Sequence, residues 1–265
     1  MANPQTQTMT THSVREVKPK SIFPFGSEYG VHPRWSRLEG WYIRQFGAVD
    51  LPSHLRARIV FRVLQELGGN VFLDVGSGTG NYSFFLSRFD SNRVWGVDVD
   101  AQRVQDCNCI ATSLGRENLH FCTGSGDVGV KAFATESFDA VLAVEVLQYV
   151  PNISLAFREL FRVLKPGGSL VGHVPVLGYL RDVEQNLFDD DNLVDLLTSA
   201  GFETAPLVRT FGGNIRRLCQ IFEWASRRRA FTALIFPILL AVTRFSRIES
   251  SDGDYRLFVA RKPLE

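Results

Sequence analysis

The sequence predicts an α/β fold with a doubly wound, mostly parallel sheet. Residues 71–75 form a continuous apolar strand that ends in a glycine-rich turn, and residues 93–99 repeat the plan of an apolar strand closed by a carboxylate. Helical and strand patterns then alternate from residue 55 to residue 209. Continuous apolar strands are typical of parallel sheets covered by helices on both faces. Such alternation indicates right-handed crossovers between parallel strands.

The turn after the first strand predicts a ligand site. Residues 71–80 read Val-Phe-Leu-Asp-Val-Gly-Ser-Gly-Thr-Gly. Glycines let the backbone turn sharply and leave room for an incoming ligand. The third glycine comes one residue earlier than in the dinucleotide pattern G-x-G-x-x-G. Because Asp74 would repel a pyrophosphate and attract an ammonium or sulfonium group, the sequence favours a cationic nucleoside.

The segment 74–80 resembles the first motif of class I S-adenosylmethionine-dependent methyltransferases. The resemblance covers about residues 55–205 and a last strand at 255–261. It implies a Rossmann-like sheet of seven strands in the order 3-2-1-4-5-7-6, with the last strand antiparallel, and S-adenosylmethionine as the cofactor. A glycine turn that binds nothing is the alternative. The cofactor contacts that it implies in this segment are Asp74, Gly76, Ser77, Gly78 and Gly80.

The second strand adds Asp98, about twenty residues after the turn, where related nucleoside folds place the acid that accepts from the ribose hydroxyls. Val99 follows it and is assigned to the same site. Asp100 competes for the ribose role, but it directly precedes a helical pattern and suits an N-cap better.

The third strand, 119–123, leads to Asp127 and Val128. The resemblance implies that these two hold the adenine, and an exposed loop carboxylate at Asp127 is the alternative.

The fourth strand, 138–144, is followed by Glu145, which the resemblance places at the cofactor. Many relatives have Glu-His where this chain has Gln148 and Tyr149, so the acid–base role of that histidine cannot be carried over. His173 on the fifth strand is the candidate general base if the acceptor is a hydroxyl, with Tyr149 as a second candidate catalytic group. A packed strand histidine is the alternative for His173.

The remaining elements follow from local signals. A helix begins at about Pro52 and ends at the glycine pair 68–69. Lys-Pro-Gly-Gly at 165–168 stops a helix before the fifth strand. The sixth strand, 203–209, contains Pro206 and is therefore expected on an edge.

Two flanking segments are expected to carry substrate specificity. Residues 1–20 read as a disordered tail and residues 21–54 as an aromatic-rich lid segment, or equally as satellite core on the sheet. The methyltransferase-like domain is then 55–265. Tyr42 and Arg56 are candidates for binding the methionine carboxylate of the cofactor.

An apolar insertion at 210–254 separates the sixth and seventh strands. Its uncharged stretch, 230–243, is shorter than the roughly twenty residues that span a bilayer, and Pro237 interrupts it. A buried cap helix pair or a homodimer contact is the main prediction. An interfacial anchor, with Arg227–Arg229 near anionic headgroups, is the alternative, and it would imply a lipid-like or lipid-linked acceptor.

The composition argues against nucleic-acid binding and against a metal site. The net charge of +1 gives no field that would attract nucleic acid. The four cysteines lack metal-site spacing, which predicts no metal and reduced thiols, and no signal peptide pattern opens the chain, so the cytoplasm is the expected location.

The predicted function is S-adenosylmethionine-dependent methyl transfer to a small molecule, on an oxygen of a saccharide, lipid or secondary metabolite. The acceptor rests on analogy at the level of the fold. A catalytically silent binding subunit and an RNA methyltransferase are the alternatives. The amino-methylating nucleic-acid branch carries Asn-Pro-Pro-aromatic after the fourth strand, where this chain has Glu-Val-Leu-Gln at 145–148.

Overall fold

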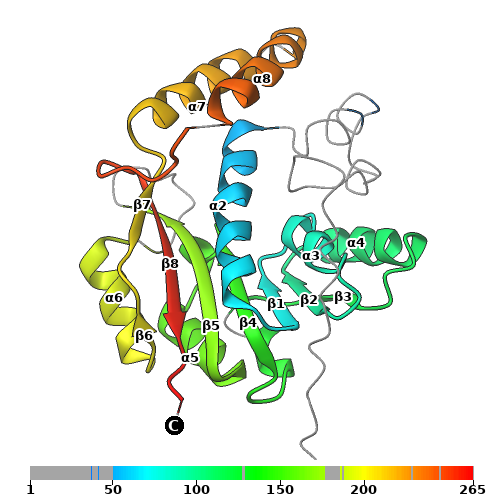
Figure 1. The fold of residues 1–265 in the computed structure, drawn as a ribbon. Helices are drawn as coiled ribbons and strands as arrows, with labels where there is room; N and C mark the ends of the chain where they lie inside the picture. The colour runs from blue at the N-terminus through cyan, green and yellow to red at the C-terminus, as the bar shows by residue number, and fades with distance from the viewer. Residues whose placement is uncertain are drawn as a thin grey trace, which may run out of the picture.

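One mixed sheet of eight strands organises the protein (Figure 1). The computed structural model describes residues 37, 41, 50–126, 129–176, 186, 188–227, 229–244 and 246–264. The strands run in the order β3-β2-β1-β4-β5-β8-β6, and β7 also pairs with β8. The strands are β1 (Val71–Val75), β2 (Arg93–Asp98), β3 (Leu119–Thr123), β4 (Phe138–Val144), β5 (Leu164–Pro175), β6 (Glu203–Thr204), β7 (Val208–Thr210) and β8 (Tyr255–Arg261).

The predicted strand order is confirmed. Strands β1 to β5 pair in parallel, and β8 lies antiparallel to β5, as expected for the last strand. The predicted sixth strand is divided into β6 and β7, which both pair with β8. Pro206 lies between them, and a proline has no N–H to donate to the ladder. The division therefore adds an eighth strand without changing the order.

Helices cover both faces of the sheet. Successive residues of β4 alternate between the two apolar layers, so that Leu142 packs with α2, α3 and α4 while Val141 packs with α5 and α6. The helices are α2 (Leu51–Leu67), α3 (Asn81–Leu86), α4 (Ala101–Ser113), α5 (Ile153–Val163), α6 (Asp190–Ser199), α7 (Gly213–Ser226) and α8 (Arg229–Thr243), with short 3-10 turns η2 (Gly129–Ala132) and η3 (Leu147–Tyr149).

The helix before the first strand begins with a cap. Asp50 accepts a hydrogen bond from the backbone N–H of Ser53 at 2.7 Å, and Pro52 occupies the first turn, where its missing N–H costs nothing. Of the predicted tail and lid, residues 1–20 lie outside the described residues, and so does most of 21–54. The domain boundaries stay predictions.

Helices α7 and α8 form a hairpin between β7 and β8 that extends beyond the sheet (Figure 1). One side of the hairpin is buried and a second apolar side is open, so the cap pair or dimer contact stays a prediction. No helix within the described ranges is both long and apolar enough to cross a membrane. The buried residues include Phe222, Phe236, Leu239 and Leu240, and the exposed ones are Ile221, Trp224, Leu234, Ile238 and Val242.

Candidate functional site

A cavity of about 500 Å³ lies at the carboxyl ends of β1 and β4. This is the edge where open α/β sheets bind ligands, and the volume is typical of small-molecule sites. Four elements and the glycine turn contribute to it. Its lining comprises Ser53 and Arg56 of α2, Gly76, Ser77, Gly78 and Thr79 of the turn, Asn81 and Tyr82 of α3, Arg103 of α4, and Val144 and Glu145 at the end of β4.

The three glycines of the turn serve different purposes. All have positive φ, at 71° for Gly76, 55° for Gly78 and 80° for Gly80. A Cβ at Gly76 would lie 2.4 Å from Val146, and one at Gly80 would lie 2.8 Å from Phe84. A Cβ at Gly78 would meet no atom within 4 Å. The prediction that all three leave room for a ligand is therefore corrected: Gly76 and Gly80 permit internal packing, and Gly78 faces open space.

Asp74 lies behind the turn rather than among the described residues that line the cavity. It is 1% exposed and accepts a hydrogen bond from Ser83 Oγ at 2.7 Å. Burial raises the pKa of Asp74 to about 6, against the lowering effect of the Ser83 hydrogen bonds, and nearby Asp98 adds to the rise. A cation placed near this carboxylate would be stabilised by its charge.

Asp98 joins the second strand to the glycine turn. Its Oδ2 accepts from the N–H of Gly78 at 2.7 Å and its Oδ1 from the N–H of Asp100 at 2.9 Å. A carboxylate has about four acceptor positions, so two remain for ribose hydroxyls. Asp100 caps α4, as predicted. Val99 is 70% exposed beside Asp98.

Three buried polar atoms at the cavity have no hydrogen-bond partner among the described residues. They are Arg56 Nε, Ser77 Oγ and Asn81 Oδ1. Leaving a buried polar group unsatisfied costs about 1–3 kcal/mol, so such groups usually mark a place where a ligand or water supplies the partner. Their position beside the open side of Gly78 fits a polar nucleoside ligand.

Glu145 connects the cavity to the interior of the sheet. It adopts a φ of 57°, uncommon for a residue with a side chain, and its Oε2 lies 3.6 Å from Arg56 Nη2. Burial alone would lower the pKa of Arg56, but Glu145 and other neighbouring groups raise it above its ordinary value. The pair thus places one negative and one positive group on the same wall.

His173 lies behind Glu145 and is fully buried. Its Nδ1 is 2.7 Å from Glu145 Oε1, its Nε2 is 3.0 Å from Thr210 Oγ1, and its ring stacks on Tyr255. Burial lowers the pKa of His173, although the hydrogen bond to Glu145 opposes this. In the neutral tautomer that satisfies both contacts, Nδ1–H donates to Glu145 and Nε2 accepts from the Thr210 hydroxyl.

Neither of the two predicted catalytic residues is among the described residues that line the cavity. His173 does not reach the cavity wall, and Tyr149, which is 42% exposed on η3, is also outside the set of described residues that line the cavity. Asp127 and Val128, predicted to hold the adenine, and Tyr42 lie outside the described residues. Within the described ranges, no group of three or more His, Cys, Asp or Glu could hold a metal ion.

Sequence reasoning missed several residues that line the cavity. Asn81 and Tyr82 follow the last glycine directly, so the residues after the turn could have been included. Ser53 lies three residues before Arg56, on the same face of α2, which the helical spacing could have indicated. Arg103 has no comparable signal in the sequence.

Comparison with known proteins identifies the domain. Residues 73–172 match the family model described as a methyltransferase domain. Residues 73–172 are therefore a methyltransferase domain, in agreement with the resemblance to class I S-adenosylmethionine-dependent methyltransferases. The match extends from β1 into β5 and thus contains the predicted cofactor residues Asp74, Asp98 and Glu145.

Two curated relatives are similar over part of their length. A sterol 24-C-methyltransferase, ERG6A of Gibberella zeae, is 30% identical over 156 residues, which cover 58% of this chain and 37% of that protein. The O-methyltransferase cnsE of Penicillium expansum is 31% identical over 184 residues, covering 61% of this chain and 64% of that protein. The chain thus spans less than two thirds of the length of either relative.

A solved structure shares the fold. The crystal structure of the [4+2]-cyclase SpnF aligns with a TM-score of 0.60 at 23% identity, over 80% of this chain and 84% of that one. At this identity the likeness concerns the fold alone.

Proposed function

We propose that the protein transfers a methyl group from S-adenosylmethionine to a small molecule, on an oxygen of a saccharide, lipid or secondary metabolite. The observation that carries the proposal is the set of unsatisfied atoms on Arg56, Ser77 and Asn81 beside the open side of Gly78. One relative is named a sterol 24-C-methyltransferase and the other an O-methyltransferase, and both names support a small acceptor.

The cofactor residues keep the roles that the motif implies. Asp98 would accept from the ribose hydroxyls, Asp74 would stabilise the positive charge, and the Arg56 guanidinium would pair with the methionine carboxylate. Asp127 and Val128 would hold the adenine, with Val99 beside it. When bound, the cofactor supplies an activated methyl group, so the protein has mainly to position the acceptor in line with it.

We assign the role of general base to Glu145 and a positioning role to His173. A base must touch the group it deprotonates. His173 would have to break its hydrogen bond with Thr210 to reach the acceptor. Glu145 already lines the cavity, and its Oε1 is held 2.7 Å from His173 Nδ1. Tyr149 stays a candidate for contact with the acceptor.

Calorimetry and a turnover assay test the proposal. The protein is expected to bind S-adenosylmethionine and S-adenosylhomocysteine and to ignore NADH, and Asp98→Ala should weaken binding by about 1.5–3 kcal/mol, the worth of hydrogen bonds to a charged group. Formation of S-adenosylhomocysteine with an extract of small molecules would support catalysis. Binding without turnover would favour a silent subunit, turnover with RNA alone would favour a nucleic-acid acceptor, and absence of binding would reject the proposal.

We also propose that the open side of α8, within 230–243, contacts an anionic membrane surface. Leu234, Ile238 and Val242 are exposed at a spacing of four residues, and Arg244 and Arg247 follow the helix. An apolar face flanked by arginines is typical of interfacial helices. A homodimer contact through the same face is the alternative, and the cytoplasmic location stays a prediction from the thiols.

A further inference from the structure

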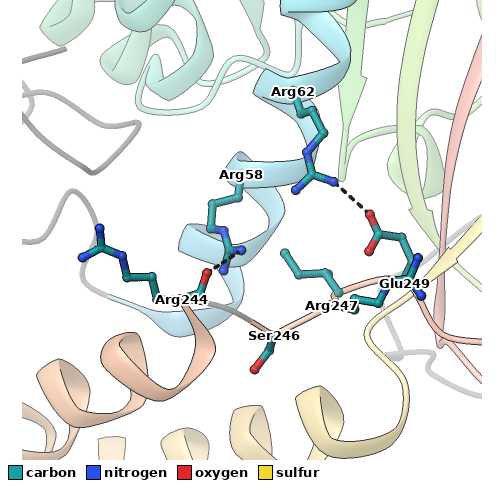
Figure 2. A pocket seen from close by; sticks show the side chains of 7 residues that line it. Arg58, Arg62, Arg244, Ser246, Arg247 and Glu249 are labelled. Atoms are coloured by element: carbon teal, nitrogen blue, oxygen red, sulfur yellow. Dashed lines mark hydrogen bonds and ion pairs between the residues drawn. The ribbon is translucent and has the colours of Figure 1, made fainter. Parts of the chain in front are cut away.

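A second cavity, of about 250 Å³, lies between α2 and the segment that follows α8. Arg58 and Arg62 extend toward that segment from α2 (Figure 2). They face away from the cofactor cavity, because Arg58 lies two residues after Arg56 and a helix turns about 100° per residue. The rest of the lining comprises Arg244, Ser246, Arg247, Ile248 and Glu249.

The cavity concentrates positive charge. Four of its seven lining residues are arginines, and its one carboxylate, Glu249, already pairs with Arg62 at 3.2 Å. The whole chain carries a net charge of only +1, so this excess is local. The guanidinium groups of Arg58 and Arg62 carry like charges one helical turn apart and therefore repel each other. Burial and this neighbouring Arg62 lower the pKa of Arg58, with Glu249 opposing them.

Contacts with other parts of the fold hold two of the four arginines, Arg58 and Arg62. Arg58 donates to the carbonyl oxygen of Thr243 at 2.7 Å and to that of Arg244 at 3.1 Å, at the carboxyl end of α8. Arg62 lies one helical turn further along α2 (Figure 2). The guanidinium of Arg244 extends outward from the rim (Figure 2). The guanidinium groups of Arg58 and Arg62 are thus positioned by contacts within the protein.

We propose that this cavity binds a phosphate group. Guanidinium groups present several N–H donors in a planar fork that matches phosphate oxygens, and a dianion would offset the repulsion between Arg58 and Arg62. Ser246 also lies on the wall, where its hydroxyl donates to the carbonyl oxygen of Val242 at 3.2 Å. The ligand is a phosphate monoester or diester, in a lipid headgroup or in a soluble molecule.

The position of the cavity favours a lipid headgroup as the source of the phosphate. The exposed residues Leu234, Ile238 and Val242 run along α8 toward the end that Arg58 holds. A phospholipid could therefore place its headgroup among the arginines while its acyl region meets the open side of the helix.

Two binding measurements distinguish the sources. Calorimetry uses inorganic phosphate, and flotation uses vesicles of phosphatidylcholine with or without phosphatidic acid. The test variant is Arg62→Gln with Arg247→Gln, and the control is Arg158→Gln, an exposed arginine on α5. Arg58 is left intact because it also holds α8, and thermal melting checks that each variant folds.

The wild-type protein is expected to bind phosphate and to float only with vesicles that contain phosphatidic acid. The double variant should lose about tenfold or more in both affinities, while Arg158→Gln retains them. Phosphate binding without flotation would support the site with a soluble ligand. No heat with phosphate, together with equal flotation of the wild type and the double variant, would overturn the proposal.

Discussion

At the residue scale, the glycine turn separates two roles that share one motif. A Cβ at Gly76 would clash with Val146, and one at Gly80 would clash with Phe84. Gly78 has open space where its Cβ would be. Only a substitution at Gly78 should therefore act on the ligand without first disturbing the packing of the turn.

Gly78→Val is expected to abolish cofactor binding, because its side chain would fill the approach to the turn. Positive φ strains any side chain, so the matched control is Gly115→Val, which has a φ of 64° and equally open surroundings outside the cavity. Calorimetry should show normal affinity for the control and no heat for Gly78→Val. Equal affinities would contradict the assignment of Gly78 to the site.

The buried Asp74 predicts a pH dependence of stability. Its pKa is about 6 in the folded protein, against 3.8 for an unperturbed aspartate, so between about pH 4 and pH 6 the folded state holds more protons than the unfolded state. The contribution of Asp74 to the free energy of unfolding is therefore fully present below pH 4. It is lost as the pH rises through 6, and the loss is about 3 kcal/mol at most.

Asp74→Asn should remove that loss. The variant is expected to match the wild type at pH 4 and to exceed its free energy of unfolding at pH 7.5, measured in urea. Asp195→Asn, an exposed position on α6, should give the wild-type profile. A wild type that gains stability from pH 4 to pH 6 relative to Asp74→Asn would refute the raised pKa.

At the element scale, α2 serves both cavities. One face carries Ser53 and Arg56 to the cofactor cavity, and the other carries Arg58 and Arg62 to the arginine-lined one. The helix is positioned by its cap and by its buried apolar residues, so its first turn should affect both sites.

Asp50→Ala is expected to lower the free energy of unfolding by about 1 kcal/mol, because the N–H of Ser53 loses its acceptor. Urea denaturation measures this loss, with Asp90→Ala at an exposed turn as the control. If both variants unfold at the same urea concentration, the cap does not contribute to stability.

The sequence predicted the elements with local signals best. The start of α2 and the cap at Asp100 follow from patterns within a few residues, whereas the strand order followed from the resemblance to a known family. The burial of His173 did not, because Thr210 and Tyr255 reach it from strands far along the chain. Side chains contributed by separate elements, such as Arg56 and Glu145, meet only when the sheet is formed.

At the scale of the whole molecule, the sheet places chemistry at one edge and an apolar hairpin beyond it (Figure 1). The sequence predicts a buried cap or a homodimer contact for the apolar run 230–243, and composition alone does not separate its two sides. The spacing of four residues between Leu234, Ile238 and Val242 is the sequence signal that places these exposed residues on one side of the helix.

Replacing these three residues tests what covers the open side of α8. Leu234→Gln, Ile238→Gln and Val242→Gln together keep a helix-forming sequence and leave the buried residues Phe236, Leu239 and Leu240 unchanged. The triple variant should float at least about tenfold less with vesicles that contain phosphatidic acid, because it removes the apolar area that would enter the lipid. Phe89→Gln, at an exposed apolar position outside the hairpin, should float like the wild type. If instead the wild type is a dimer by light scattering, the triple variant is a monomer and neither binds vesicles, the face is a contact between two copies and the membrane proposal fails.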